Sequence, residues 1–120
     1  LIISITFIHM VEYSTMDDTF GALADPTRRS IVNQLMAGPM RVTDIAQPYS
    51  MSLNSVSKHL RILERAKLVR REIRGRDHWM HFDQESLTHA RNWADSVLRF
   101  WESRLESLEA SLEADEGTDQ

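Results

Sequence analysis

Residues 51–72 read MSLNSVSKHLRILERAKLVRRE, and within this segment the spacing of apolar side chains changes from a helical to a strand pattern. The helical part repeats every three or four residues, at Leu53, Val56, Leu60 and Leu63. That spacing predicts an amphipathic helix, and Ser52 belongs to the residue types that cap helix N-termini. After Leu68, apolar and polar residues alternate instead. The segment therefore predicts a helix over 52–66 that leads directly into a β-strand.

Three shorter helices are predicted upstream. Asp25-Pro26 is a typical helix start, because Asp caps well and Pro is tolerated at the first helical position. This helix ends before Gly38-Pro39. A shorter amphipathic helix precedes it at about 17–23, and a third covers 42–47. Two short helices joined by a tight turn, here at 49–51, form a helix-turn-helix.

A β-hairpin and a long helix are predicted downstream. The strand after Leu68 and a second strand at 78–82 flank RGRD at 74–77, where Gly75 permits the positive φ of a hairpin turn. A long amphipathic helix follows at about 84–113, with a length of roughly 40 Å. The predicted fold class is mainly α with a two-stranded β wing: a winged helix-turn-helix followed by a long C-terminal helix.

The 120 residues amount to about one domain, which we divide into four parts. Residues 1–15 form an apolar N-terminal extension of unassigned origin, 16–83 the winged helix-turn-helix domain, 84–114 a dimerisation helix and 115–120 a frayed tail. The extension begins LIISITFIHMV. It lacks the basic start and the cleavage site of a signal peptide, and it is too short to span a bilayer.

Composition and charge exclude several classes of function. The chain has no Cys, which excludes disulfides, thiolate metal sites and cysteine nucleophiles and fits a cytoplasmic location. The net charge of −4 hides a split, since residues 41–76 carry nine basic and three acidic side chains and residues 77–120 carry three and eleven. A basic middle beside an acidic end indicates a polyanion-binding face and a region with a separate role. Ordinary solvated helix surfaces are the other interpretation.

Four segments in register resemble the ArsR/SmtB family of bacterial winged-helix repressors. They are FGALADPTRRSIVNQL at 20–35, VTDIA at 42–46, the segment at 51–72 and GRDHWMHFD at 75–83. The resemblance implies a homodimeric, sequence-specific repressor, acting on its own operon, that binds double-stranded operator DNA. In this architecture the terminal helices pack together and the recognition helices enter successive major grooves. Many members release DNA when a metal, a metalloid or an oxidant binds.

The exposed face of the helix at 52–66 carries groups that can contact DNA. Short polar residues and His can bond base edges, whereas Lys and Arg neutralise phosphate or bind guanine. The wing tip at 70–82 would contact the backbone or the minor groove. One of Arg28 and Arg29 would face phosphate and the other would pair with an acidic residue of the terminal helix, while Trp79 is expected in the core. The expected DNA-contacting residues are Arg28, Arg41, Ser52, Asn54, Ser55, Ser57, Lys58, His59, Arg61, Arg74 and Arg76.

The long helix carries an apolar stripe that could serve as internal core, as a membrane-surface face or as a dimer seam. Its polar face is acidic, and an acidic face repels anionic lipid, so we expect no membrane contact. Large exposed apolar patches are uncommon on monomers, and we therefore predict a homodimer. The expected dimerisation residues are Phe20, Val97, Trp101, Leu105, Leu108 and Leu112.

The sensor sites of the family are not retained. Members that sense metalloids have two Cys around the Val of the first helix of the helix-turn-helix, where this chain has Arg41 and Thr43 around Val42. The zinc-sensing pattern, anchored on His89, yields Leu87, Phe100 and Ser103, which cannot bind a metal. We therefore expect no metal and no cofactor, and we leave the effector unassigned. No catalytic set is visible. The alternative function is a winged-helix adaptor whose basic face binds an acidic protein.

Overall fold

The structure, a computed structural model, describes residues 16–118 and the side chains of residues 16–115. The expected extension at 1–15 lies outside the described residues. The chain divides after Ala90 into two compact units. The first contains all the strands and every helix except the greater part of the last one, and the second consists of the rest of that helix.

The helices of the first unit begin where the sequence places their caps. Residues 16–23 are helical, and they are followed by α2 (Pro26–Leu35), α3 (Val42–Ala46) and α4 (Leu53–Arg65). The Asp25 side chain accepts a hydrogen bond from the backbone of Arg28 at 3.0 Å. The Ser52 hydroxyl accepts one from the backbone of Ser55 at 3.2 Å. Both predicted N-caps are confirmed, because each satisfies an N–H that has no partner within its helix.

The wing is an antiparallel hairpin with a third, very short strand beside it. Strands β2 (Val69–Arg74) and β3 (Asp77–Phe82) pair along their full length, with Arg74 opposite Asp77. Gly75 has a φ of 61° at the first turn position, as in the type II′ turns that suit hairpins. Strand β1 (Met40–Arg41) pairs with β3 and gives the order β1-β3-β2. The two-stranded prediction missed β1, since two residues are too few to show an alternating pattern.

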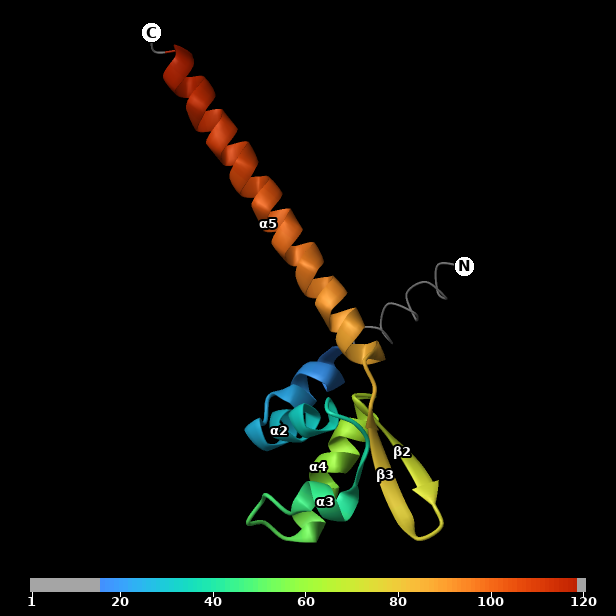
Figure 1. Ribbon diagram of the computed structural model, residues 1–120. Coiled ribbons are helices and arrows are strands. Elements are labelled where there is room, and N and C mark those ends of the chain that lie inside the picture. Colours follow the sequence, from blue (N-terminus) through green and yellow to red (C-terminus); the bar gives the residue numbers. More distant parts are fainter. Residues whose placement is uncertain (1–15, 119–120) are drawn as a thin grey trace, which may run out of the picture. The chain divides into compact units, whose positions relative to one another are not determined.

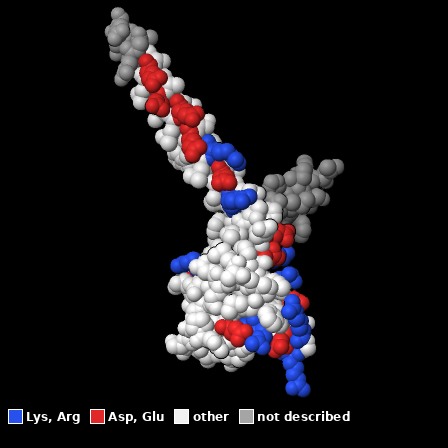
Figure 2. Space-filling model, viewed as in Figure 1, with Lys and Arg blue, Asp and Glu red and all other residues white. Residues whose placement is uncertain are grey.

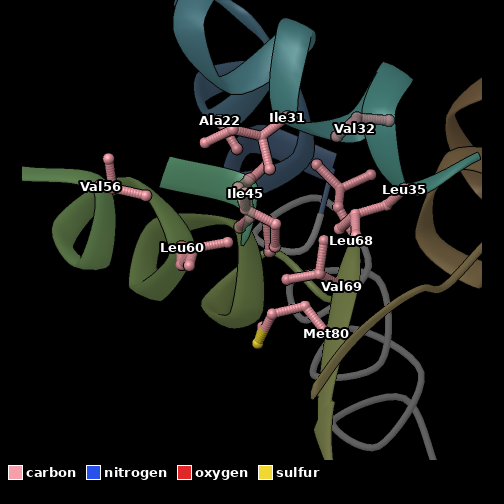
Figure 3. Close-up of a cluster of buried hydrophobic side chains, with 12 residues drawn as sticks. Ala22, Ile31, Val32, Leu35, Ile45, Val56, Leu60, Leu68, Val69 and Met80 are labelled. Carbon is pink, nitrogen blue, oxygen red and sulfur yellow. The ribbon is translucent and has the colours of Figure 1, made fainter. Parts of the chain in front are cut away.

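One apolar cluster joins the helices to the wing. Figure 3 shows buried side chains from α2, α3, α4 and both long strands directed into the same volume. Ile45 of α3, Leu60 of α4 and Met80 of β3 are completely buried. Because these three residues come from different elements, the cluster fixes α4 against α3 and the hairpin beside α4 (Figure 1).

The end of α4 is closed by a Schellman motif. The N–H of Leu68 donates to the carbonyl of Leu63 at 3.0 Å, and the N–H of Lys67 donates to that of Glu64, also at 3.0 Å. Lys67 has a φ of 58°, a left-handed conformation in which Gly is the usual residue. The chain therefore leaves α4 and enters β2 through a strained position.

Replacing Lys67 with Gly is expected to stabilise the protein by about 0.5–1 kcal/mol. Gly removes the steric cost of the left-handed conformation, which stabilises the folded state. Part of this gain is lost because Gly has more conformational freedom in the unfolded chain. Urea unfolding at fixed protein concentration measures it as a raised midpoint with an unchanged slope. Lys67→Ala is the matched control, since Ala keeps the strain. An equal gain in both variants would show that the Lys side chain, and not the backbone, is unfavourable.

The last element, α5 (Glu85–Thr118), contains 34 residues. It is anchored at its start by the Ser86 hydroxyl, which donates to the carbonyl of Lys67 at 2.9 Å. The helix runs to Thr118, so the tail predicted to fray from residue 115 is helical up to that point. None of the helices within the described part of the chain is long and apolar enough to cross a membrane.

Candidate nucleic-acid interface

The outer face of α4 is free of the protein core. Burial of Val56, Leu60 and Leu63 turns the opposite side of the helix outward, so that Asn54, Lys58 and Arg61 are exposed. The side chains of Lys58 and Arg61 form no hydrogen bond or ion pair with another residue of the described range 16–115. Two cations and one amide are thereby available on the side of the helix that would enter a groove.

The first turn of α4 uses two of its serines internally. The hydroxyls of Ser52 and Ser55 lie 3.1 Å apart, and the Ser52 hydroxyl also caps the helix. Ser57, on the next turn, is half-buried and has no such bond. Of the three predicted serine contacts, Ser57 is the one whose hydroxyl is available to a ligand.

An open groove of about 270 Å³ lies between the helix-turn-helix and the wing. It brings together predicted residues from three elements: Arg41 before α3, Ser57 of α4 and Arg76 of the wing turn. Figure 2 shows basic side chains gathered along the wing side of this unit, with a few acidic ones among them. Three of the eleven expected DNA contacts therefore line one groove, while Lys58 and Arg61 do not line it.

Trp79 lies on the outer face of the wing rather than in the core, so that prediction is wrong. The alternation along β3 turns Met80 into the core and Trp79 to the other side, where it is half-buried. The guanidinium carbon of Arg74 lies 4.9 Å from the indole ring centre and that of Arg41 lies 5.9 Å from it. Both distances are within cation–π range.

Glu72 restrains one of the predicted DNA contacts. Its carboxylate accepts hydrogen bonds from Arg74 at 2.7 and 3.1 Å and lies 2.6 Å from Nε2 of His81. The bonds from Arg74, and then that from His81, lower the pKa of Glu72 to about 2. The carboxylate is therefore charged at every physiological pH, and Arg74 is held by Glu72 and Trp79 while Arg76 has no ion pair within the described chain.

The inner face of the wing is braced against α4 by a second carboxylate. The Nε of Arg71 lies 3.2 Å from both carboxylate oxygens of Glu64, and its Nη1 lies 2.8 Å from Nδ1 of His78. A bidentate pair of this kind fixes orientation as well as distance. The hairpin is thus tied to the recognition helix by a contact that the sequence analysis did not identify.

Arg28 and Arg29 bind carbonyl groups at the end of the helical segment 16–23. Arg28 donates to the carbonyls of Ala22 at 2.7 Å and Gly21 at 3.2 Å, and Arg29 donates to that of Leu23 at 2.7 Å. Arg28 also lies 3.3 Å from Nδ1 of His59 on α4. The sequence analysis expected one of the two arginines to face phosphate and the other to pair with an acidic residue. It did not predict these contacts with backbone carbonyls.

The distal part of α5 carries the predicted apolar stripe in exposed positions. Trp101, Leu105, Leu108 and Leu112 are each 59 % exposed and Val97 is 36 % exposed. Phe20, in the first unit, is 45 % exposed. On the face that Figure 2 shows, acidic side chains dominate the C-terminal part of the helix. The stripe is large enough to require a cover in solution.

Residues 16–115 bring no three His, Asp or Glu side chains together in a way that could hold a metal ion. The side chains around Val42, which are Arg41 and Thr43, supply a cation and a neutral hydroxyl. Neither is a ligand for a soft metal or a metalloid.

A capped recognition helix with an open outer face, beside a hairpin whose turn carries a cation, defines a winged helix-turn-helix DNA-binding regulator. Residues 23–72 match a helix-turn-helix domain family. Over 110 residues, 92 % of this chain and 99 % of the relative, the sequence is 36 % identical to the HTH-type transcriptional regulator Rv2034 of Mycobacterium tuberculosis.

Solved structures agree with the sequence matches. An ArsR family transcriptional regulator, RHA00566, superposes with a TM-score of 0.72 at 34 % identity over 75 % of this chain and 93 % of the other. The homodimeric winged helix-turn-helix DNA-binding domain of Mb0332 from Mycobacterium bovis gives 0.57 at 25 % identity over 84 % and 88 %. The chain belongs to the ArsR/SmtB family of transcriptional regulators, and the adaptor alternative is not favoured.

Proposed function

We propose that this regulator is a homodimeric repressor that places α4 in the major groove of an operator and its wing against the DNA backbone or minor groove. The observation that carries the proposal is the convergence of Arg41, Ser57 and Arg76 on one groove beside the exposed face of α4. An α-helix fits the major groove of duplex DNA, and cations beside the helix can then contact the phosphates that border the groove.

The proposed contacts divide into two kinds. Base edges would be read from α4 by Asn54 and Ser57, whose short side chains can donate and accept hydrogen bonds. Phosphates would be neutralised by Lys58, Arg61 and Arg76, which are exposed and unpaired within the described chain. Arg41 and Arg74 would add less, because Asp44 binds the first at 3.1 Å and Glu72 holds the second.

The partner that covers the apolar stripe of α5 would be a second copy of the chain. Exposure of four large side chains in the single chain supports this, as does the homodimeric state of the Mycobacterium bovis relative. Two recognition helices would then contact half-sites about 34–36 Å apart, or one turn of DNA. A dimer so placed can exclude RNA polymerase from a promoter, and the protein would act in the cytoplasm, where the chromosome is.

Sequence-specific binding is tested with an operator selected from a pool of randomised duplexes. The wild type is expected to prefer that operator to a random duplex of the same length. Asn54→Ala should lower operator affinity by about tenfold to a hundredfold and leave random duplex unchanged, while Arg76→Ala should weaken both alike. Anisotropy titrations at one fixed salt concentration measure the affinities of the three proteins for the two duplexes. Failure of the pool to yield an enriched sequence, or equal losses from both variants on both duplexes, contradicts the proposal.

A further inference from the structure

Arg28 lies in the first turn of α2 and makes contacts in two directions. Its backbone N–H donates to the Asp25 carboxylate at 3.0 Å. Its side chain extends back to the preceding helical segment, where Nε donates to the carbonyl of Ala22 at 2.7 Å and Nη2 to that of Gly21 at 3.2 Å. These carbonyls belong to the last turn of the segment, where helix carbonyls lack a partner within the helix.

The remaining nitrogen of the guanidinium contacts the recognition helix. Nη1 of Arg28 lies 3.3 Å from Nδ1 of His59. A guanidinium only donates hydrogen bonds, so this contact requires an unprotonated Nδ1. In a neutral imidazole the proton is then on Nε2. One side chain therefore connects the segment 16–23, α2 and α4. The Asp25 carboxylate lies 3.8 Å from the same Nδ1, too far for a hydrogen bond, so the contact with Arg28 favours the tautomer with a bare Nδ1.

His59 occupies the flank of α4 between the buried and the exposed faces. Its side chain is 22 % exposed, whereas Lys58 beside it is fully on the outer face. A contact at this position opposes rotation of α4 about its own axis, in addition to the packing of Val56, Leu60 and Leu63. Rotation matters because a polar group must be held within about 0.5 Å and 10–20° to discriminate among partners.

We propose that Arg28 is a positioning residue for sequence recognition, which sets the orientation of α4 by binding the Gly21 and Ala22 carbonyls and His59 together. The inference rests on the proposed operator binding. It replaces the expectation that Arg28 neutralises a phosphate, because three of its nitrogens are already bound within the protein.

The tautomer of His59 tests the proposal without any DNA. The imidazole ¹⁵N spectrum of the free protein is recorded at neutral pH. The His59 signals are identified by their absence in the spectrum of His59→Ala. They should show a proton on Nε2 and none on Nδ1. Arg28→Lys should shift them toward a mixture of tautomers, because a single ammonium cannot replace the planar fork. Arg29→Ala removes a cation one residue away that binds the Leu23 carbonyl and not His59, and it should leave the signals unchanged. A protonated Nδ1 in the wild type, or identical signals in Arg28→Lys, overturns the proposal.

DNA titrations separate positioning from phosphate contact. Arg28→Lys should lower operator affinity by about threefold to tenfold and leave random-duplex affinity and its salt dependence unchanged. His59→Ala, which removes the imidazole that Arg28 contacts, should give the same result. Arg29→Ala should preserve the preference. Equal losses on both duplexes with a shallower salt dependence would make Arg28 a phosphate contact and refute the proposal. If Arg28→Lys does not fold, His59→Ala decides, since retained preference refutes positioning. A wild type without operator preference would defeat the proposed function alone, because the tautomer result does not depend on DNA.

Discussion

Raising the salt concentration from 50 to 200 mM is expected to lower operator affinity about a thousandfold. Lys58, Arg61 and Arg76 are the cations of the proposed site that have no ion pair in the described chain. They supply three phosphate contacts per protomer and six per dimer. Each contact releases counterions, so the logarithm of affinity should fall with the logarithm of salt with a slope of about −5. Titrations at four or five salt concentrations give the slope directly.

Two variants at the wing show which cations contribute to that slope. Arg76→Ala removes one contact per protomer, so the slope should become shallower by about two per dimer. Glu72→Gln should make it steeper by up to the same amount, because it releases Arg74 from the carboxylate that binds it at 2.7 Å. An unchanged slope in Arg76→Ala would remove the wing from the DNA interface. A slope of about −1 in the wild type would mean that phosphate contact does not drive binding.

Much of the fold could be predicted because its determinants are local. Asp25 and Ser52 cap helices that begin at the next residue, and Gly75 takes the positive φ that a hairpin turn requires. The period of three to four residues through Val56 and Leu60 placed the buried side of α4 correctly. Because the buried side of α4 was correct, the prediction that Asn54, Lys58 and Arg61 are exposed on the opposite side was also correct.

One prediction was wrong, and two contacts were not predicted. Trp79 was assigned to the core because a winged helix must hold its hairpin in place, but Trp79 and Met80 are neighbours on β3 and therefore point to opposite faces, and Met80 is the buried one. Arg74 was counted as a free cation, although Glu72 lies two positions before it on the same face of β2. That spacing of two in a strand was a readable signal of the ion pair. The contact from Arg28 to His59 spans 31 residues, and no local pattern indicates it.

Replacing Leu105 with Glu is expected to convert the dimer to a monomer at micromolar concentration and to lower operator affinity by about 10²- to 10⁴-fold. A carboxylate at the centre of an apolar seam would be buried without a partner. Losing the dimer also removes the effective concentration that the first half-site contact gives to the second. Leu105 is 59 % exposed in the single chain, so the protomer itself should keep its helix content and its weak affinity for random duplex. Sedimentation velocity and operator titration measure the two effects on the same samples.

The matched control is Ser103→Glu, which adds the same charge about 200° around the helix from Leu105. Ser103 is exposed and lies away from the apolar stripe, so this variant should remain dimeric and bind the operator normally. Net charge and helix length are then equal in the two proteins, and only the face that carries the carboxylate differs. Dissociation of both variants would mean that the added charge, and not the seam, disrupts assembly. A Leu105→Glu protein that remains dimeric would place the contact elsewhere, and the exposed stripe of α5 would then have some other partner.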